Sequence, residues 1–88
     1  MNLGEYVQSL EPQILQSIQE SIRIPSVEGP QKPGMLFGEG VAKALEHALQ
    51  TADSMGFRTV NLEGKIGYAE YGEGEEMIAV LGHLDMVP

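Results

Sequence analysis

The feature that most restricts the fold is an uninterrupted apolar run, Met77 to Leu81, followed at once by Gly82-His83-Leu84-Asp85. A run without polar alternation is typical of a strand covered on both faces, as in α/β folds. Ligand-binding and catalytic side chains in open α/β sheets gather just beyond the carboxyl ends of strands. The run therefore predicts a buried strand that delivers His83 and Asp85 to a functional loop.

His83 and Asp85 have the chemistry and the spacing of one corner of a metal site. Residues two apart point to the same side of an extended segment. Neutral imidazole is a good zinc ligand, and a nearby carboxylate can fix its tautomer and raise its basicity. The tripeptide alone is weak, because a chain with this composition contains His-x-Asp by chance about once in twenty cases. A loop histidine whose aspartate merely starts a turn remains the alternative.

The amino-terminal half is expected to be helical. Apolar residues at helical spacing over residues 1–24 lie on one stripe, which Pro12 interrupts. The pattern predicts a short helix to about Ser9 and a second one from near Glu11 to Ile24-Pro25. Residues 25–38 have the composition of a Pro/Gly loop, and residues 39–56 form a further helix that Gly56 stops. The expected buried face of that helix consists of Val41, Leu45, Ala48, Leu49, Ala52 and Met55, whereas His47 is expected in solvent with no partner.

Three short strands are expected after this helix, at residues 57–62, 65–71 and 76–81. Glu63-Gly64 and residues 72–75 supply the turns. Residues 57–82 therefore form a three-stranded β-meander, and residues 83–88 form the metal-site loop. The predicted fold class is α/β, with two to three helices followed by this meander, and 88 residues allow one domain or part of one.

The stretch from Ile66 to Pro88 resembles the zinc-dependent aminoacylase, acetylornithine deacetylase and succinyl-diaminopimelate desuccinylase family. It is most similar to the bacterial peptidase V and Xaa-His dipeptidase branch. Three further motifs agree in order and spacing, and the resemblance covers the chain from about Leu15 onward: Ile24-Pro25-Ser26-Val27, the segment Phe37 to Leu45, and Gly56-Phe57 followed by Asn61.

The resemblance implies a di-zinc exopeptidase catalytic domain. It assigns His83 as a ligand of one zinc ion and Asp85 as the catalytic aspartate that buttresses this ligand. The family's metal-bridging aspartate, its Glu-Glu pair and its other ligands have no position in these 88 residues. A catalytic zinc normally has three protein ligands. We therefore expect a truncated amino-terminal piece that is inactive alone and binds zinc weakly or not at all.

The expected function of the whole protein is zinc-dependent hydrolysis of dipeptides by metal-activated water, with N-acyl amino acids as alternative substrates. A non-catalytic binding or assembly module that keeps the scaffold is the other possibility. The formal net charge of -8 disfavours nucleic-acid and membrane partners. The start of the chain lacks a basic and apolar leader, which suggests a cytoplasmic location. Because the strand at 76–81 would lack a neighbour, we expect the fragment to self-associate through its edge.

Overall fold

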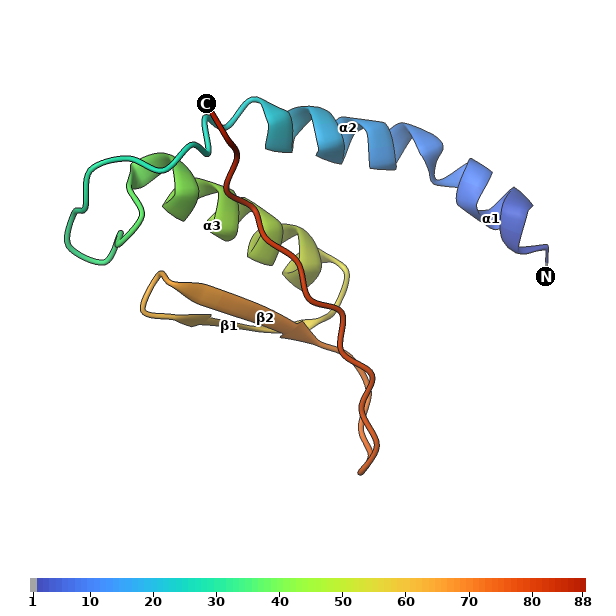
Figure 1. Ribbon diagram of the computed structural model, residues 1–88. Coiled ribbons are helices and arrows are strands. Elements are labelled where there is room, and N and C mark those ends of the chain that lie inside the picture. Colours follow the sequence, from blue (N-terminus) through green and yellow to red (C-terminus); the bar gives the residue numbers. More distant parts are fainter. Residues whose placement is uncertain (1) are drawn as a thin grey trace.

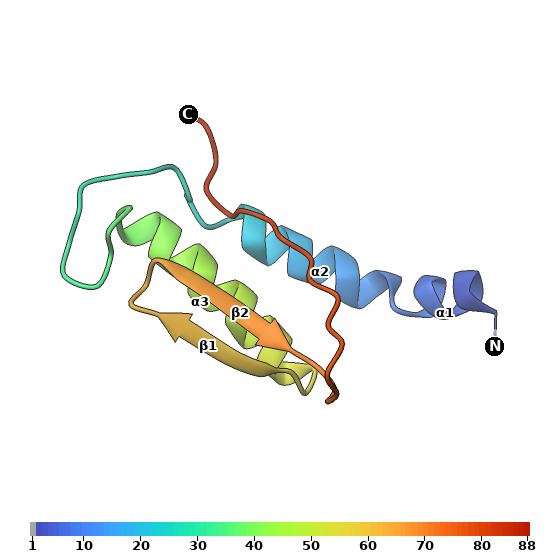
Figure 2. The same cartoon turned by 60° about the horizontal axis from the view of Figure 1, so that its bottom comes forward.

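The computed structural model describes residues 2–88 and contains three helices and one β-hairpin (Figure 1). Helix α3 lies between two neighbours, because α2 packs on one side of it and the hairpin on the other (Figures 1 and 2). The fold is α/β, as the sequence predicts. The elements in chain order are α1 (Leu3–Ser9), α2 (Glu11–Ile22), α3 (Glu39–Ser54), β1 (Arg58–Leu62) and β2 (Ile66–Glu70).

The break between α1 and α2 lies where Pro12 predicts it. Asn2 caps α1, since its Oδ1 accepts a hydrogen bond from the Glu5 amide at 3.2 Å. Leu10 ends α1 and also caps α2, and Pro12 occupies the first turn of α2, where its missing N–H costs nothing. The predicted division of the amino-terminal helical segment is confirmed.

Helix α3 begins after Gly38 and ends before Gly56, and both glycines have positive φ, 99° and 90°. Ala44 is the buried hydrophobic residue of the described chain, and most of the predicted inward face of α3 is half-buried. The prediction for Met55 is wrong, because this residue lies beyond the last helical residue and is 62% exposed. Helix α3 therefore contributes mainly half-buried side chains to the core.

The hairpin is antiparallel and pairs Val60 with Tyr68 at its centre. Its turn has positive φ at Glu63 (57°) and Gly64 (73°), as tight hairpins require. The two described strands agree with the first two predicted ones. At Gly67, an added Cβ would come within 2.9 Å of a Leu49 methyl group, so the glycine lets β2 lie close against α3.

The predicted third strand is absent, so the expectation of a three-stranded β-meander over 57–82 is wrong for the described residues. Beyond β2 the chain turns away at Gly72 and Gly74, with φ of 86° and 138°. Residues 76–81 are extended but pair with neither strand, and Ile78 and Val80 are 96% and 94% exposed. An apolar strand without alternation needs cover on both faces. Within residues 2–88 no layer provides that cover, so burial cannot offset the entropy of ordering the strand.

The last residues run back beside α3 to the loop that joins α2 and α3 (Figures 1 and 2). Val27 and Met86 form a parallel bridge, in which the Met86 amide donates to the Ser26 carbonyl at 3.0 Å. Ser26 is buried at this junction. None of the helices in residues 2–88 is long and apolar enough to cross a membrane.

Candidate metal site

His83 and Asp85 lie on the extended segment that returns toward the α2–α3 loop, and their side chains meet. Nδ1 of His83 is 3.0 Å from Oδ1 of Asp85 and 3.3 Å from the Asp85 carbonyl oxygen. The two-residue spacing of an extended segment predicts this contact. When Nδ1 carries the ring proton and donates a hydrogen bond to the carboxylate, Nε2 keeps a lone pair that can bind a metal ion. The roles of ligand and orienting carboxylate stay predictions.

The His83–Asp85 pair lines a groove of about 390 Å³ between the carboxyl-terminal segment, the hairpin turn and the first half of α3. The apolar part of its wall consists of Phe37, Val41, Leu45 and Ile66. Glu28 and Lys65 add one acid and one base to the lining. Sequence reasoning did not single out these two residues, because they come from separate loops that only the fold brings together.

The donors present fit one corner of a zinc site and no more. An imidazole with a hydrogen-bonded carboxylate is a common arrangement around zinc. Across residues 2–88, however, no third histidine or acidic side chain joins them in a metal-binding group. His83 is also 83% exposed, so water competes freely for its free nitrogen. This chain on its own therefore offers a weak metal site at most.

The α2–α3 loop that supports the groove is tied to the start of α3. Lys32 Nζ and Lys43 Nζ each lie 3.1 Å from an oxygen of Glu39, and these bonds, that of Lys32 first, lower the pKa of the Glu39 carboxyl. Gly40 packs against the backbone of Pro25, where a Cβ would clash with the carbonyl oxygen. The loop is thereby held at the position where its Ser26 carbonyl meets the returning segment.

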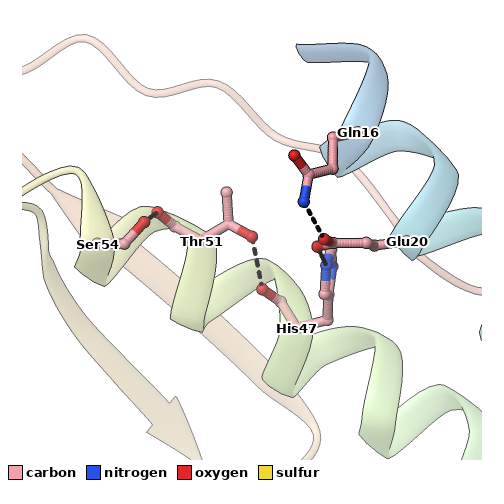
Figure 3. A network of polar contacts seen from close by, with 5 residues as sticks. All are labelled: Gln16, Glu20, His47, Thr51 and Ser54. Carbon is pink, nitrogen blue, oxygen red and sulfur yellow. Dashed lines mark hydrogen bonds and ion pairs between the residues drawn. The ribbon is translucent and has the colours of Figure 1, made fainter. Parts of the chain in front are cut away.

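The other histidine, His47, belongs to a contact between helices rather than to the groove (Figure 3). Its Nε2 lies 3.3 Å from Oε2 of Glu20 on α2, and Gln16 donates to the other oxygen of Glu20 at 3.1 Å. The hydrogen bond with His47 is the main cause that lowers the pKa of Glu20. The expectation of a solvent-exposed His47 without a partner is wrong, since its side chain is only 21% exposed. The partner lies 27 residues away in sequence, beyond the reach of spacing rules.

No family model matches the chain. Among curated proteins, the chain is similar to "Putative dipeptidase YtjP" of Bacillus subtilis (strain 168), with 44% identity over 77 residues, which are 85% of this chain and 17% of that protein. Proteins named "Putative dipeptidase" from Staphylococcus aureus (strain USA300) and Staphylococcus haemolyticus (strain JCSC1435) are each 33% identical over 86 residues, which are 96% of this chain and 18% of theirs. The chain therefore spans about a sixth of the length of the curated relatives it matches. Along nearly all of its length, it is similar to proteins that carry a dipeptidase name.

Proposed function

We propose that these residues are the amino-terminal part of a zinc-dependent amide hydrolase, a dipeptidase of the aminoacylase, acetylornithine deacetylase and succinyl-diaminopimelate desuccinylase family. The observation that carries the proposal is the His83–Asp85 pair, with Nδ1 and Oδ1 3.0 Å apart on the wall of a groove. The dipeptidase names of the relatives support the same reading. These names also favour dipeptides over N-acyl amino acids as substrates.

In this proposal His83 holds zinc through Nε2, and Asp85 acts on His83 rather than on the substrate. The carboxylate keeps the proton on Nδ1 and fixes the plane of the ring, so that Nε2 faces outward as a base. Bound zinc would polarise the substrate carbonyl and lower the pKa of a water molecule. The groove's apolar wall would pack against the side chain of the substrate.

In this proposal the chain is part of a longer polypeptide, whose other residues would supply the remaining ligands and the general base. The chain matches only 17–18% of its relatives, which leaves ample length for them. A two-metal site requires more donors than one imidazole and one carboxylate. We therefore expect the 88-residue chain alone to be inactive.

The test uses the longer polypeptide, with zinc content measured by mass spectrometry and hydrolysis followed with an unblocked dipeptide. His83→Ala should lose one zinc equivalent and the activity. Asp85→Asn keeps the shape of the side chain but loses the charge, and it should weaken zinc affinity or activity by about 10- to 100-fold. His47→Ala is the matched control, because His47 lies outside the groove, and it should keep both zinc and activity.

Two results would overturn the proposal. One is an unchanged zinc content and hydrolysis rate in both His83→Ala and Asp85→Asn, with circular dichroism showing that the variants fold. The other is a wild-type polypeptide that cleaves no dipeptide at any zinc concentration. Faster cleavage of N-acetyl amino acids than of dipeptides would keep the metal site but change the substrate to that of a deacylase.

A further inference from the structure

Helix α2 carries an apolar stripe that consists of Ile14, Ile18 and Ile22, with Leu15 beside them. Residues four apart lie one above the other on a helix, so the three isoleucines share one face. Their exposed fractions are 42%, 48% and 75%, and that of Leu15 is 49%. The apolar stripe of a surface helix normally faces the core of its domain. In the part of the chain that the structure describes, much of this stripe faces solvent instead.

The contact between α2 and α3 uses the opposite face of α2. Oε2 of Glu20 lies 3.3 Å from Nε2 of His47, and Gln16 donates to the other carboxylate oxygen at 3.1 Å (Figure 3). Gln16 and Glu20 each follow an isoleucine of the stripe by two residues, which turns them through about 200° around the helix axis. The stripe therefore points away from the side on which Glu20 meets His47. Among the helices and strands of residues 2–88, α2 contacts α1 and α3, and the exposed fractions show that neither covers the stripe.

We propose that the apolar stripe of α2 is the docking face for residues that follow Pro88 in the longer polypeptide. This inference rests on that part of the proposed function which makes the chain a piece of such a polypeptide. The lengths of the relatives support it, because the chain matches only 17–18% of each. The docked surface is apolar as well, since the four side chains of the stripe offer neither a charge nor a hydrogen bond.

A second copy of the chain fits this face less well. Helix α2 has 12 residues, so its face is about 18 Å long and about 10 Å wide. Such a face falls well short of the roughly 800 Å² that each partner buries in a stable protein–protein interface. A covalently linked segment needs less area, because the link gives it an effective concentration on the order of millimolar. The stripe is therefore buried within one polypeptide rather than between two.

Thiol labelling tests this proposal without any measurement of activity. Residues 1–88 contain no cysteine, so Ile18→Cys and Gln13→Cys each introduce one thiol into this region. Gln13 is the matched control, because it is exposed on the same helix and lies about 140° around the axis from Ile18. A maleimide is added to the native protein, and labelling of each site is followed by peptide mass spectrometry.

In the 88-residue chain, the two thiols should react at rates within about threefold of each other, because both positions are exposed. In the longer polypeptide, the thiol of Ile18→Cys should react at least about 10-fold more slowly than that of Gln13→Cys, since buried thiols are inert. Ile22→Cys repeats the measurement one turn further along the stripe, and circular dichroism checks that each variant folds.

Equal labelling rates at Ile18 and Gln13 in the longer polypeptide would overturn the proposal. Protection of Ile18→Cys in the 88-residue chain itself would also overturn it, and an increase of that protection with concentration would identify a second copy as the occupant. If the longer polypeptide cleaves no dipeptide while the thiol of Ile18→Cys is protected, the hydrolase function is refuted and the docking face is supported.

Discussion

Replacement of Gly40 by alanine tests whether the groove depends on the close approach of α3 to the α2–α3 loop. The added Cβ would clash with the Pro25 carbonyl oxygen and would lie 2.9 Å from the Pro25 carbonyl carbon. Both of these atoms belong to the backbone, so no side chain can move away to make room. Overpacking of this kind typically costs about 1–3 kcal/mol.

An opposing effect must be subtracted, because alanine is a better helix former than glycine by about 1 kcal/mol. The net destabilisation expected for Gly40→Ala is therefore about 0–2 kcal/mol relative to the wild type. In a chain of this size, each kcal/mol lowers Tm by about 4–8 °C. Gly4→Ala is the matched control, since Gly4 is also the second residue of its helix and its Cβ would meet only the Asn2 side chain. This control should have an unchanged or slightly raised Tm.

The assay is thermal and urea unfolding of both variants, followed by circular dichroism. Hydrogen exchange adds a local readout at the Met86 amide, whose bond to the Ser26 carbonyl depends on the same loop. The Met86 amide should exchange its hydrogen faster in Gly40→Ala than in the wild type. If Gly40→Ala proved as stable as Gly4→Ala, the tight contact with Pro25 would not be part of the fold.

Two further predictions concern pH and association. The folded-state pKa of Glu20 is lowered, so its ionised form contributes stability at neutral pH that is lost as the pH falls through this lowered value. The Tm difference between the wild type and Glu20→Gln should therefore shrink as the pH is lowered below the ordinary glutamate pKa of 4.5, and a constant difference in a calorimetric pH series would contradict the reasoning. We also propose that residues 76–81 pair with a second copy of the chain, because Ile78 and its apolar neighbours are exposed. Light scattering should show dimers or larger species for the wild type and for the control Gln13→Lys but monomers for Ile78→Lys, and a monomeric wild type over a wide concentration range would refute this pairing.

Sequence rules predicted the elements whose ends are set by nearby residues. Pro12 separates α1 from α2, Gly38 and Gly56 bound α3, and Glu63-Gly64 turns the hairpin. Each of these signals acts within a few residues, through a missing N–H or a positive φ. Local patterns were therefore sufficient for three helices and two strands.

The errors arose where structure depends on distant residues. The apolar run at 76–81 has the composition of a buried strand, but burial requires layers that residues 2–88 do not contain. The sequence predicted a solvent-exposed His47 because no partner lies at helical spacing from it, whereas its partner in the structure, Glu20, belongs to another helix. Spacing brought His83 and Asp85 together, whereas the groove around them also needs Lys65 and Glu28 from separate loops. Neither loop carries a local sequence pattern that predicts its position beside His83 and Asp85.

The bridge between Val27 and Met86 closes a loop of roughly sixty residues. Closing a loop of that length costs about 4 kcal/mol of chain entropy at the (3/2)RT ln n scaling, beyond any constant term. The helices and the hairpin form through contacts between residues close in sequence, which are made quickly, whereas the Val27–Met86 bridge joins residues far apart in sequence and is expected to form late. We therefore expect the segment that carries His83 to order last when the chain folds and to detach first when it unfolds.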